Sequence, residues 1–155
     1  MFERRVGGID AFRLRIVREP MSQDKPLTRK QVQDLLRKKQ ALDSLDLRGA
    51  NLAGIIFDGV SLRWTKLAEA NMGGCSFKKA DLTGASLWNA ELPNAVFENA
   101  ILDEADLDLA NLEGCSFKGA RMRKAILPHG TRGTERIMDS VKTGTPVHFQ
   151  AMKLS

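Results

Sequence analysis

The stretch ADLTGASLWNAEL, residues 80–92, repeats one pattern every five positions. Alanine stands at Ala80, Ala85 and Ala90, and a leucine follows each of them two residues later. On an α-helix a step of five drifts around the axis, and along a flat strand it alternates between the two faces. Neither regular element therefore explains the pattern.

The same register runs without interruption over residues 43–127, which is seventeen consecutive pentads. The last residue of every pentad is large and apolar. Two positions earlier, from Ala70 to Ala125, only alanine occurs apart from Cys75 and Cys115. Two columns this regular indicate that both point into one core, so the chain must turn a corner about once per pentad.

Four such corners close a coil of twenty residues, and the aromatic residues provide an independent check. The phenylalanines within the repeat are spaced by twenty. We therefore predict that successive coils pair as parallel strands about 4.8 Å apart, which stacks the phenylalanines in register. The two cysteines lie on the same side but about 10 Å apart, too far for a disulfide. The predicted core ladder consists of Phe57, Phe77, Phe97, Phe117, Cys75 and Cys115.

The A(D/N)LXX pattern, seen at 50–52 (ANL), 70–72 (ANM) and 80–82 (ADL), resembles the pentapeptide-repeat family. The resemblance implies an all-β solenoid: a right-handed quadrilateral parallel β-helix, here of about four coils, with short α-helical or strand caps at both ends. It implies no particular biochemical role. A bulkier residue replaces alanine in early pentads, which suggests a wider or capped first coil; these residues are Leu45, Ile55, Val60 and Thr65.

The two ends of a solenoid expose unpaired backbone and core, so each needs a cap. We assign residues 1–27 to a basic N-terminal arm containing a candidate edge strand, and residues 28–42 to a capping helix. Thr28 followed three residues later by Gln31 is a capping-box pattern. The apolar face of this helix is predicted to contain Val32, Leu35, Leu36 and Leu42.

Residues 128–155 form the predicted C-terminal cap. A short helix is expected over 135–142, with Thr134 as its N-cap. A candidate strand covers 147–154. Either this strand or the one in the N-terminal arm would lie over an end of the solenoid or pair with a second subunit, which makes a homodimer through a capped end a candidate assembly. The apolar face of the helix is predicted to be Ile137, Met138 and Val141.

Charge is distributed unevenly along the chain. Residues 1–42 carry eleven Lys and Arg against five Asp and Glu, whereas residues 43–127 carry nine against twelve and residues 128–155 four against two. No apolar run approaches the roughly 18 to 20 residues of a membrane span. The charged N-terminus lacks the apolar core of a signal peptide, and with two cysteines we expect a cytoplasmic protein.

Residue types that carry catalysis are sparse. The two histidines, His129 and His148, lie outside the repeat and lack a clustered partner. Both cysteines are predicted to be core residues, and nothing supplies four close metal ligands. We therefore expect no enzyme activity, no metal, no cofactor and no small-molecule substrate.

The surface offers more. Trp64 and Trp88 are predicted to occupy outward positions about a coil apart on neighbouring sides, and exposed tryptophan is enriched at interface hot spots. Outward Ile56, Val96 and Ile126 add apolar area, as does Ile101. We expect a non-enzymatic interaction or scaffold module with a protein partner, unless the flanking segments cover the tryptophans. The candidate partner-binding surface is Trp64, Trp88, Asp103, Glu104, Asp106 and Asp108.

Two other functions remain open. The basic arm suggests binding of nucleic acid or another anionic surface, with affinity that falls steeply with salt. The family resemblance also suggests a DNA mimic acting on gyrase, although a repeat of about four coils with a net charge of −3 argues against it. The candidate anion-binding residues are Arg13, Arg15, Arg18, Arg29, Lys30, Arg37, Lys38 and Lys39.

Overall fold

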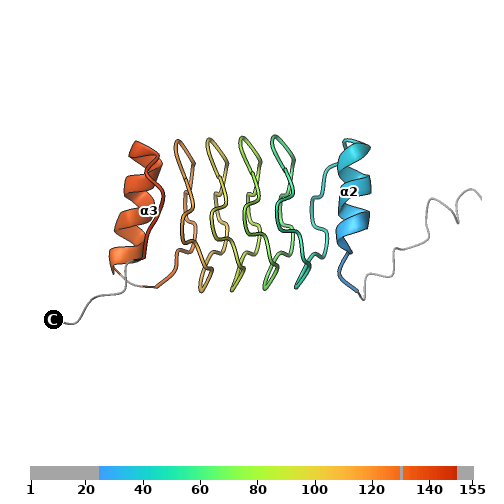
Figure 1. The fold of residues 1–155 in the computed structure, drawn as a ribbon, viewed down its shortest axis with the longest axis horizontal. Coiled ribbons are helices and arrows are strands. Elements are labelled where there is room, and N and C mark those ends of the chain that lie inside the picture. Colours follow the sequence, from blue (N-terminus) through green and yellow to red (C-terminus); the bar gives the residue numbers. More distant parts are fainter. Residues whose placement is uncertain (1–24, 130, 150–155) are drawn as a thin grey trace, which may run out of the picture.

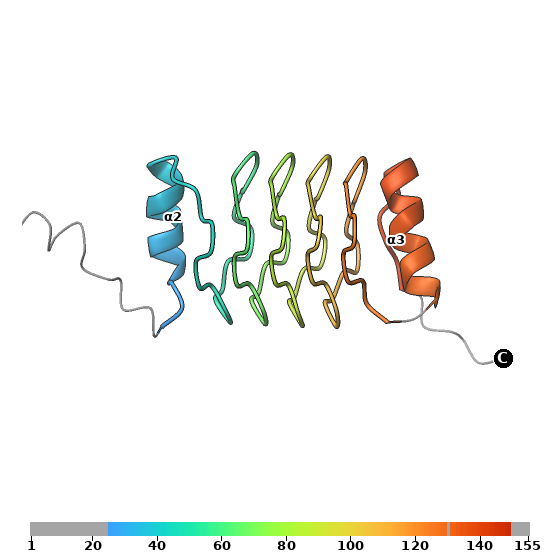
Figure 2. The same ribbon diagram turned by 180° about the vertical axis from the view of Figure 1, so that it is seen from behind.

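The protein is a solenoid with a helix at each end (Figures 1 and 2). The computed structural model describes residues 25–129 and 131–149, and its helices are α2 (Arg29–Arg37) and α3 (Thr131–Thr143). Between them, thirteen parallel bridges join residues twenty apart, from Asp46–Lys66 to Asp106–Ile126. Each bridge is a single residue pair, so within the described ranges the coils pair in parallel, as predicted, but through isolated bridges instead of strands.

Each pentad begins with a tight turn. The N–H of Ala50 donates to the carbonyl of Leu47 at 3.2 Å, three residues back, and the same bond recurs along the repeat. In all seventeen pentads the third residue of this turn has φ between +52° and +74°, as a type II turn requires. Seven of these residues are glycine and three are asparagine, the residues that adopt this conformation most readily.

The aspartate or asparagine of the repeat supports the same turn. Asp81 Oδ1 accepts a hydrogen bond from the N–H of Thr83 at 3.0 Å, and Asn111 Oδ1 accepts one from the N–H of Glu113 at 3.2 Å. This side-chain bond to the backbone two residues ahead is an Asx turn. A short polar residue is therefore favoured directly before each inward leucine.

The interior is a ladder of stacked side chains. All four phenylalanines of the ladder are fully buried, and their neighbouring ring centroids lie 4.9 to 5.0 Å apart with planes within 5° of parallel. Cys75 and Cys115 are buried free thiols. Each thiol donates to a carbonyl of the preceding coil, at Leu52 (3.1 Å) and Leu92 (3.0 Å).

Helix α2 takes the place of one coil. The N–H of Leu27 donates to the carbonyl of Asp46 at 2.8 Å, and the N–H of Leu42 donates to that of Ser61 at 2.9 Å. Equivalent backbone bonds join the inward large apolar positions of consecutive coils, so Leu27 and Leu42 occupy two such positions. Helix α2 lies within the fifteen-residue step between them. Val32, on helix α2, is fully buried and covers the N-terminal end of the solenoid.

The bounds of α2 differ from the predicted 28–42. The capping box of Thr28 and Gln31 is present, but the helix ends at Arg37 with Lys38 as its C-cap. Lys39 then adopts a left-handed conformation, with φ +54°. The helix ends before Leu42 because Leu42 occupies an inward position of the solenoid, where its backbone N–H pairs with the next coil.

Helix α3 covers the other end and begins at Thr131, four residues before the predicted start. Ile137 is fully buried, and the buried Ser140 Oγ accepts a hydrogen bond from the N–H of Phe117 at 3.1 Å. Met138 does not belong to the apolar face as predicted, because it is 44% exposed.

A short tail after α3 completes the cap without forming a strand over 145–149. Val147 is buried; it accepts from the N–H of Gly114 at 2.6 Å and donates to the carbonyl of Cys115 at 2.8 Å. His148 Nδ1 lies 2.9 Å from Glu113 Oε1. The remainder of the candidate strand, and the candidate edge strand of the N-terminal arm up to residue 24, lie outside the described residues.

Candidate functional site

One wall of the solenoid carries the residues of the predicted partner-binding surface. Its outward column is a continuous chain of bridges: Asp46, Lys66, Ser86, Asp106 and Ile126. Trp64 precedes this column by two residues and Trp88 follows it by two. The indoles therefore flank this column, one at each of its two corners. We call this column and its flanking corner residues the tryptophan wall.

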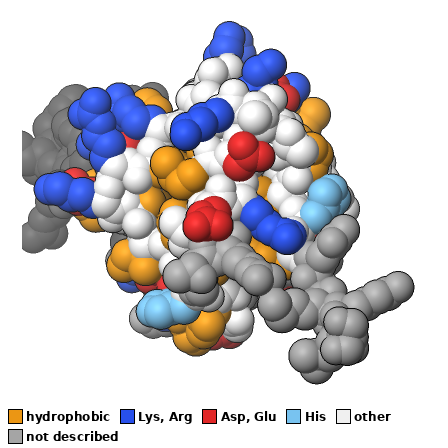
Figure 3. All heavy atoms as spheres, turned by 90° about the vertical axis from the view of Figure 1, so that its left-hand side faces the viewer, with side chains coloured by type: hydrophobic (Ala, Val, Ile, Leu, Met, Phe, Trp, Pro, Cys, Tyr) orange, Lys and Arg blue, Asp and Glu red, His pale blue; other side chains and the backbone are white. Residues whose placement is uncertain are grey.

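Exposed apolar side chains concentrate on this wall. Seven large hydrophobic residues are exposed within the described ranges, and four of them belong to the tryptophan wall. The other three lie at the two ends of the molecule. Figure 3 shows the α3 end, where hydrophobic and charged side chains are interspersed. The four on the wall are Trp64 (52%), Trp88 (38%), Leu109 (58%) and Ile126 (51%).

Trp64 adopts an unusual backbone conformation for its size. Its φ is +58°, in the left-handed region that the repeat mostly fills with glycine and asparagine. A bulky residue there costs about 1 to 2 kcal/mol. One coil further on stands Gly84, and a Cβ at that position would overlap the six-membered part of the Trp64 indole. The ring thus occupies space that only a glycine leaves open, while half of its surface remains exposed.

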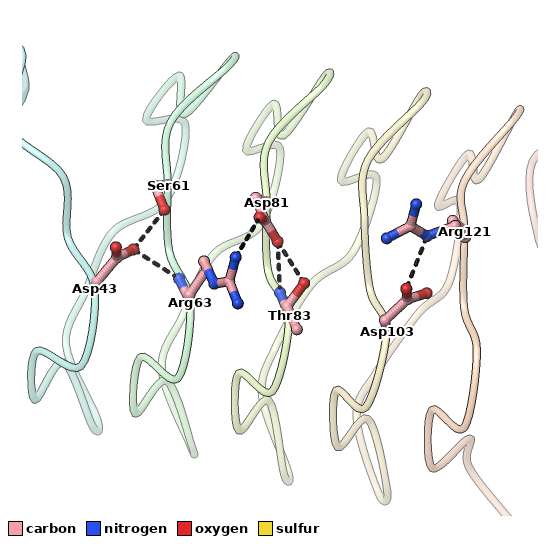
Figure 4. A network of polar contacts seen from close by, with 7 residues as sticks. All are labelled: Asp43, Ser61, Arg63, Asp81, Thr83, Asp103 and Arg121. Atoms are coloured by element: carbon pink, nitrogen blue, oxygen red, sulfur yellow. Dashed lines mark hydrogen bonds and ion pairs between the residues drawn. The ribbon is translucent and has the colours of Figure 1, made fainter.

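The predicted acidic residues lie on the same wall, but most of them already have partners. Asp103 Oδ2 accepts from Arg121 Nε at 2.7 Å (Figure 4), and Asp108 Oδ1 lies 2.7 Å from His129 Nδ1. Asp106 Oδ1 accepts from the N–H of Asp108 at 3.0 Å in an Asx turn. Among these four carboxylates only Glu104 has no hydrogen bond or ion pair within the described residues.

The environment of Asp103 holds it in its charged form. Partial burial raises the pKa of this carboxyl, but the hydrogen bonds from Arg121 Nε and the Arg123 N–H, together with the charges of both arginines, outweigh burial. The pKa of Asp103 therefore lies below its ordinary value. This carboxylate joins two consecutive coils.

Polar contacts also link consecutive coils elsewhere along the corner that contains Asp103. Asp43 Oδ1 accepts from Ser61 Oγ at 2.6 Å and from the N–H of Arg63 at 2.9 Å, both in the next coil (Figure 4). Asp81 in turn pairs with Arg63 at 3.7 Å. These polar contacts fix the spacing of the coils at the corner that carries Trp64.

The predicted anion-binding residues are only partly described, since Arg13, Arg15 and Arg18 lie outside the described residues. Arg29 Nη1 donates to the carbonyl of Ala53 at 2.7 Å, and Arg37 pairs with Asp34 at 3.4 Å. The exposed lysines that complete the set are Lys30, Lys38 and Lys39.

Among the described residues, side chains able to carry chemistry do not cluster. Over residues 25–129 and 131–149 no three His, Cys, Asp or Glu side chains come close enough to hold a metal ion. Burial raises the pKa of both cysteine thiols, that of Cys115 to about 12. In the described part of the chain no helix is long and apolar enough to cross a membrane.

The chain belongs to the pentapeptide-repeat family, since the pentapeptide-repeat model matches eight copies at residues 46–84, 80–119 and 90–127. It is similar to the crystal structure of a pentapeptide-repeat protein (Rfr23) from the cyanobacterium Cyanothece 51142, with 31% identity over 70% of each chain and a TM-score of 0.56.

Two further solved structures share this fold. A pentapeptide-repeat protein from the Arabidopsis thaliana thylakoid lumen is 32% identical over 54% of this chain and 57% of its own, with a TM-score of 0.52. Protein alr5209 from Nostoc PCC 7120 is 25% identical over 76% of this chain and 97% of its own, with a TM-score of 0.65. No functionally curated protein matches the chain.

Proposed function

We propose that this protein is a non-enzymatic interaction module that presents the tryptophan wall to a protein partner. The observation that carries the proposal is Trp64, a half-exposed indole held in a left-handed backbone conformation over Gly84. An unfavourable conformation that leaves a large apolar ring in water indicates a use for the ring outside the fold.

The composition of the wall fits a protein interface. Trp64, Trp88, Leu109 and Ile126 supply apolar area, and tryptophan is the residue type most enriched at binding hot spots. Charged residues at the Trp64 corner are largely engaged with one another. They would form a polar rim that need not be desolvated when the indoles are covered.

Affinity capture with the full chain tests the proposal. The variant Trp64→Ala/Trp88→Ala should lose a protein that the wild type retains from lysate of the source cells. The matched control is Met138→Ala/Phe149→Ala, which removes two residues of 44% and 40% exposure at the α3 end. Recovery of the same proteins by wild type and the tryptophan variant would reject the tryptophan wall as the binding surface.

A further inference from the structure

The first coil has an unpaired backbone edge on the wall opposite the tryptophan wall. In the later coils, the N–H of Ser76 donates to the carbonyl of Ile55 at 3.2 Å, and the N–H of Val96 donates to the carbonyl of Cys75 at 2.9 Å. Ile56 holds the same place in the first coil, where no coil precedes it. Neither its N–H nor its carbonyl has a hydrogen-bond partner among the described residues.

This edge lies at the bottom of a groove between α2 and the first coil. Two adjoining hollows of about 320 and 550 Å³ open there, and Leu36 and Ile56 line both of them. Ile56 is 66% exposed, the highest value among the exposed large hydrophobic residues of the described chain. Val60 extends the apolar floor at one end and Ile55 at the other.

The rim of the groove is basic. Arg29 and Arg37 line one hollow, and Lys39 lines the other. Arg29 donates to the carbonyl of Ala53 and Arg37 pairs with Asp34, but both arginines are exposed. Asp58 lines the same hollow as Lys39. Its carboxylate already accepts hydrogen bonds from Ser76 Oγ and from the N–H of Lys78 in the next coil. Residues 25–42 carry six Lys and Arg against one Asp, so the segment that forms this side of the groove has a formal charge of +5.

We propose that the groove binds an extended acidic segment of a partner protein by strand addition. The segment's backbone would pair with the N–H and carbonyl of Ile56, as a preceding coil would. Alternate side chains would then point toward the groove, so that apolar ones cover Ile56 while carboxylates reach Arg37 and Lys39. The site is separate from the tryptophan wall and does not depend on it.

The chain's own N-terminal arm fits this groove less well. Its candidate edge strand, AFRLRIV at residues 11–17, has two arginines and no carboxylate, and Arg18 follows it directly. Like charges would face one another along a basic rim. Charge therefore favours an acidic occupant over this segment and over the same segment from a second copy.

The probe is a fluorescein-labelled peptide, EVEVEVE, titrated with the full chain at low salt and followed by fluorescence anisotropy. It should bind, whereas KVKVKVK should not. Ile56→Asp should weaken binding by about tenfold or more, since it removes the apolar floor and adds a like charge. The matched control is Ile126→Asp, which alters an isoleucine at the same pentad position, 51% exposed on the tryptophan wall, and should change nothing.

Two further variants separate the contributions. Arg37→Glu/Lys39→Glu should reverse the preference in favour of KVKVKVK. An EVEVEVE peptide with N-methylated backbone amides should lose binding, because it cannot pair with an edge. Trp64→Ala/Trp88→Ala should leave peptide binding unchanged, so that failure of the proposed function and failure of this site are distinguishable.

Several results would overturn the proposal. Equal binding of the two peptides, unchanged affinity of Ile56→Asp, or full binding of the N-methylated peptide would each do so. Tighter probe binding after Leu14→Asp would show that the chain's own arm occupies the groove. A dimer in sedimentation equilibrium that Ile56→Asp dissociates would assign the groove to a second copy. Displacement of the probe by a single-stranded oligonucleotide of equal charge would show a general polyanion surface.

Discussion

Replacing Phe97 by alanine tests the ladder at its centre. Phe97 is fully buried and stacks on Phe77 and Phe117, with ring centroids 4.9 Å away on each side. Deleting a buried phenylalanine side chain costs about 3 to 5 kcal/mol, because apolar burial is lost and a cavity remains. The expected loss in the free energy of unfolding lies in this range.

Phe57 provides a comparison within the same ladder. It is equally buried but stacks on Phe77 alone, since it begins the row. Phe57→Ala loses one ring pair instead of two, so it should destabilise by about 0.5 to 1.5 kcal/mol less than Phe97→Ala. The order of the two variants therefore reports the stacking itself, separately from burial.

Urea unfolding followed by circular dichroism measures both variants, with equal m values required before their free energies are compared. For a chain of this size, 3 kcal/mol corresponds to a fall in Tm of about 6 to 12 °C. A change below about 0.5 kcal/mol for Phe97→Ala would be typical of a surface site and would refute the inward ladder.

Three further predictions concern single residues. Gly84→Ala should destabilise the protein more than Gly59→Ala, because both have positive φ but only a Cβ at residue 84 overlaps Trp64; urea unfolding of the two variants measures the difference. The raised pKa of the Cys115 thiol predicts no labelling by a thiol reagent before unfolding. The unfolded thiol ionises first, so this residue's contribution to the free energy of unfolding should be complete below about pH 9 and fall as pH rises toward about 12. Glu113 should release the tail after α3 in acid, as hydrogen exchange at Val147 would report.

The sign of the Glu113 effect follows from its contacts. The N–H of Phe149 and the His148 ring hydrogen-bond to this carboxylate and hold its pKa below the ordinary value of 4.5. Its stabilising effect is complete above that value and is lost as pH falls through the lowered folded-state pKa. Glu113→Gln is the control, since its tail should exchange rapidly at neutral pH already.

Contrary outcomes are specific to each prediction. Equal stability of the two glycine variants would mean that the Trp64 ring does not rest over residue 84. Rapid labelling of Cys115 in the native protein would contradict its burial. Protection of Val147 that does not change between pH 7 and pH 3 would show that Glu113 does not hold the tail.

The sequence by itself determined the repeat and its interior. Each pentad closes its own turn and meets an equivalent pentad twenty residues away, so the inward columns and the row from Phe57 to Phe117 follow from counting alone. The capping box at Thr28 was equally readable, because it joins residues three apart. The membership in the pentapeptide-repeat family rests on this same local pattern.

Only the tertiary structure decided what happens where the period ends. Helix α3 begins at Thr131, before the position that its sequence pattern predicted, and the pairing of Leu42 with Ser61 in the next coil sets the end of α2 at Arg37. The pairing of Asp108 with His129 and the groove beside Ile56 also depend on contacts with segments outside the repeat. Such contacts have no fixed spacing along the chain, and periodicity therefore cannot reveal them.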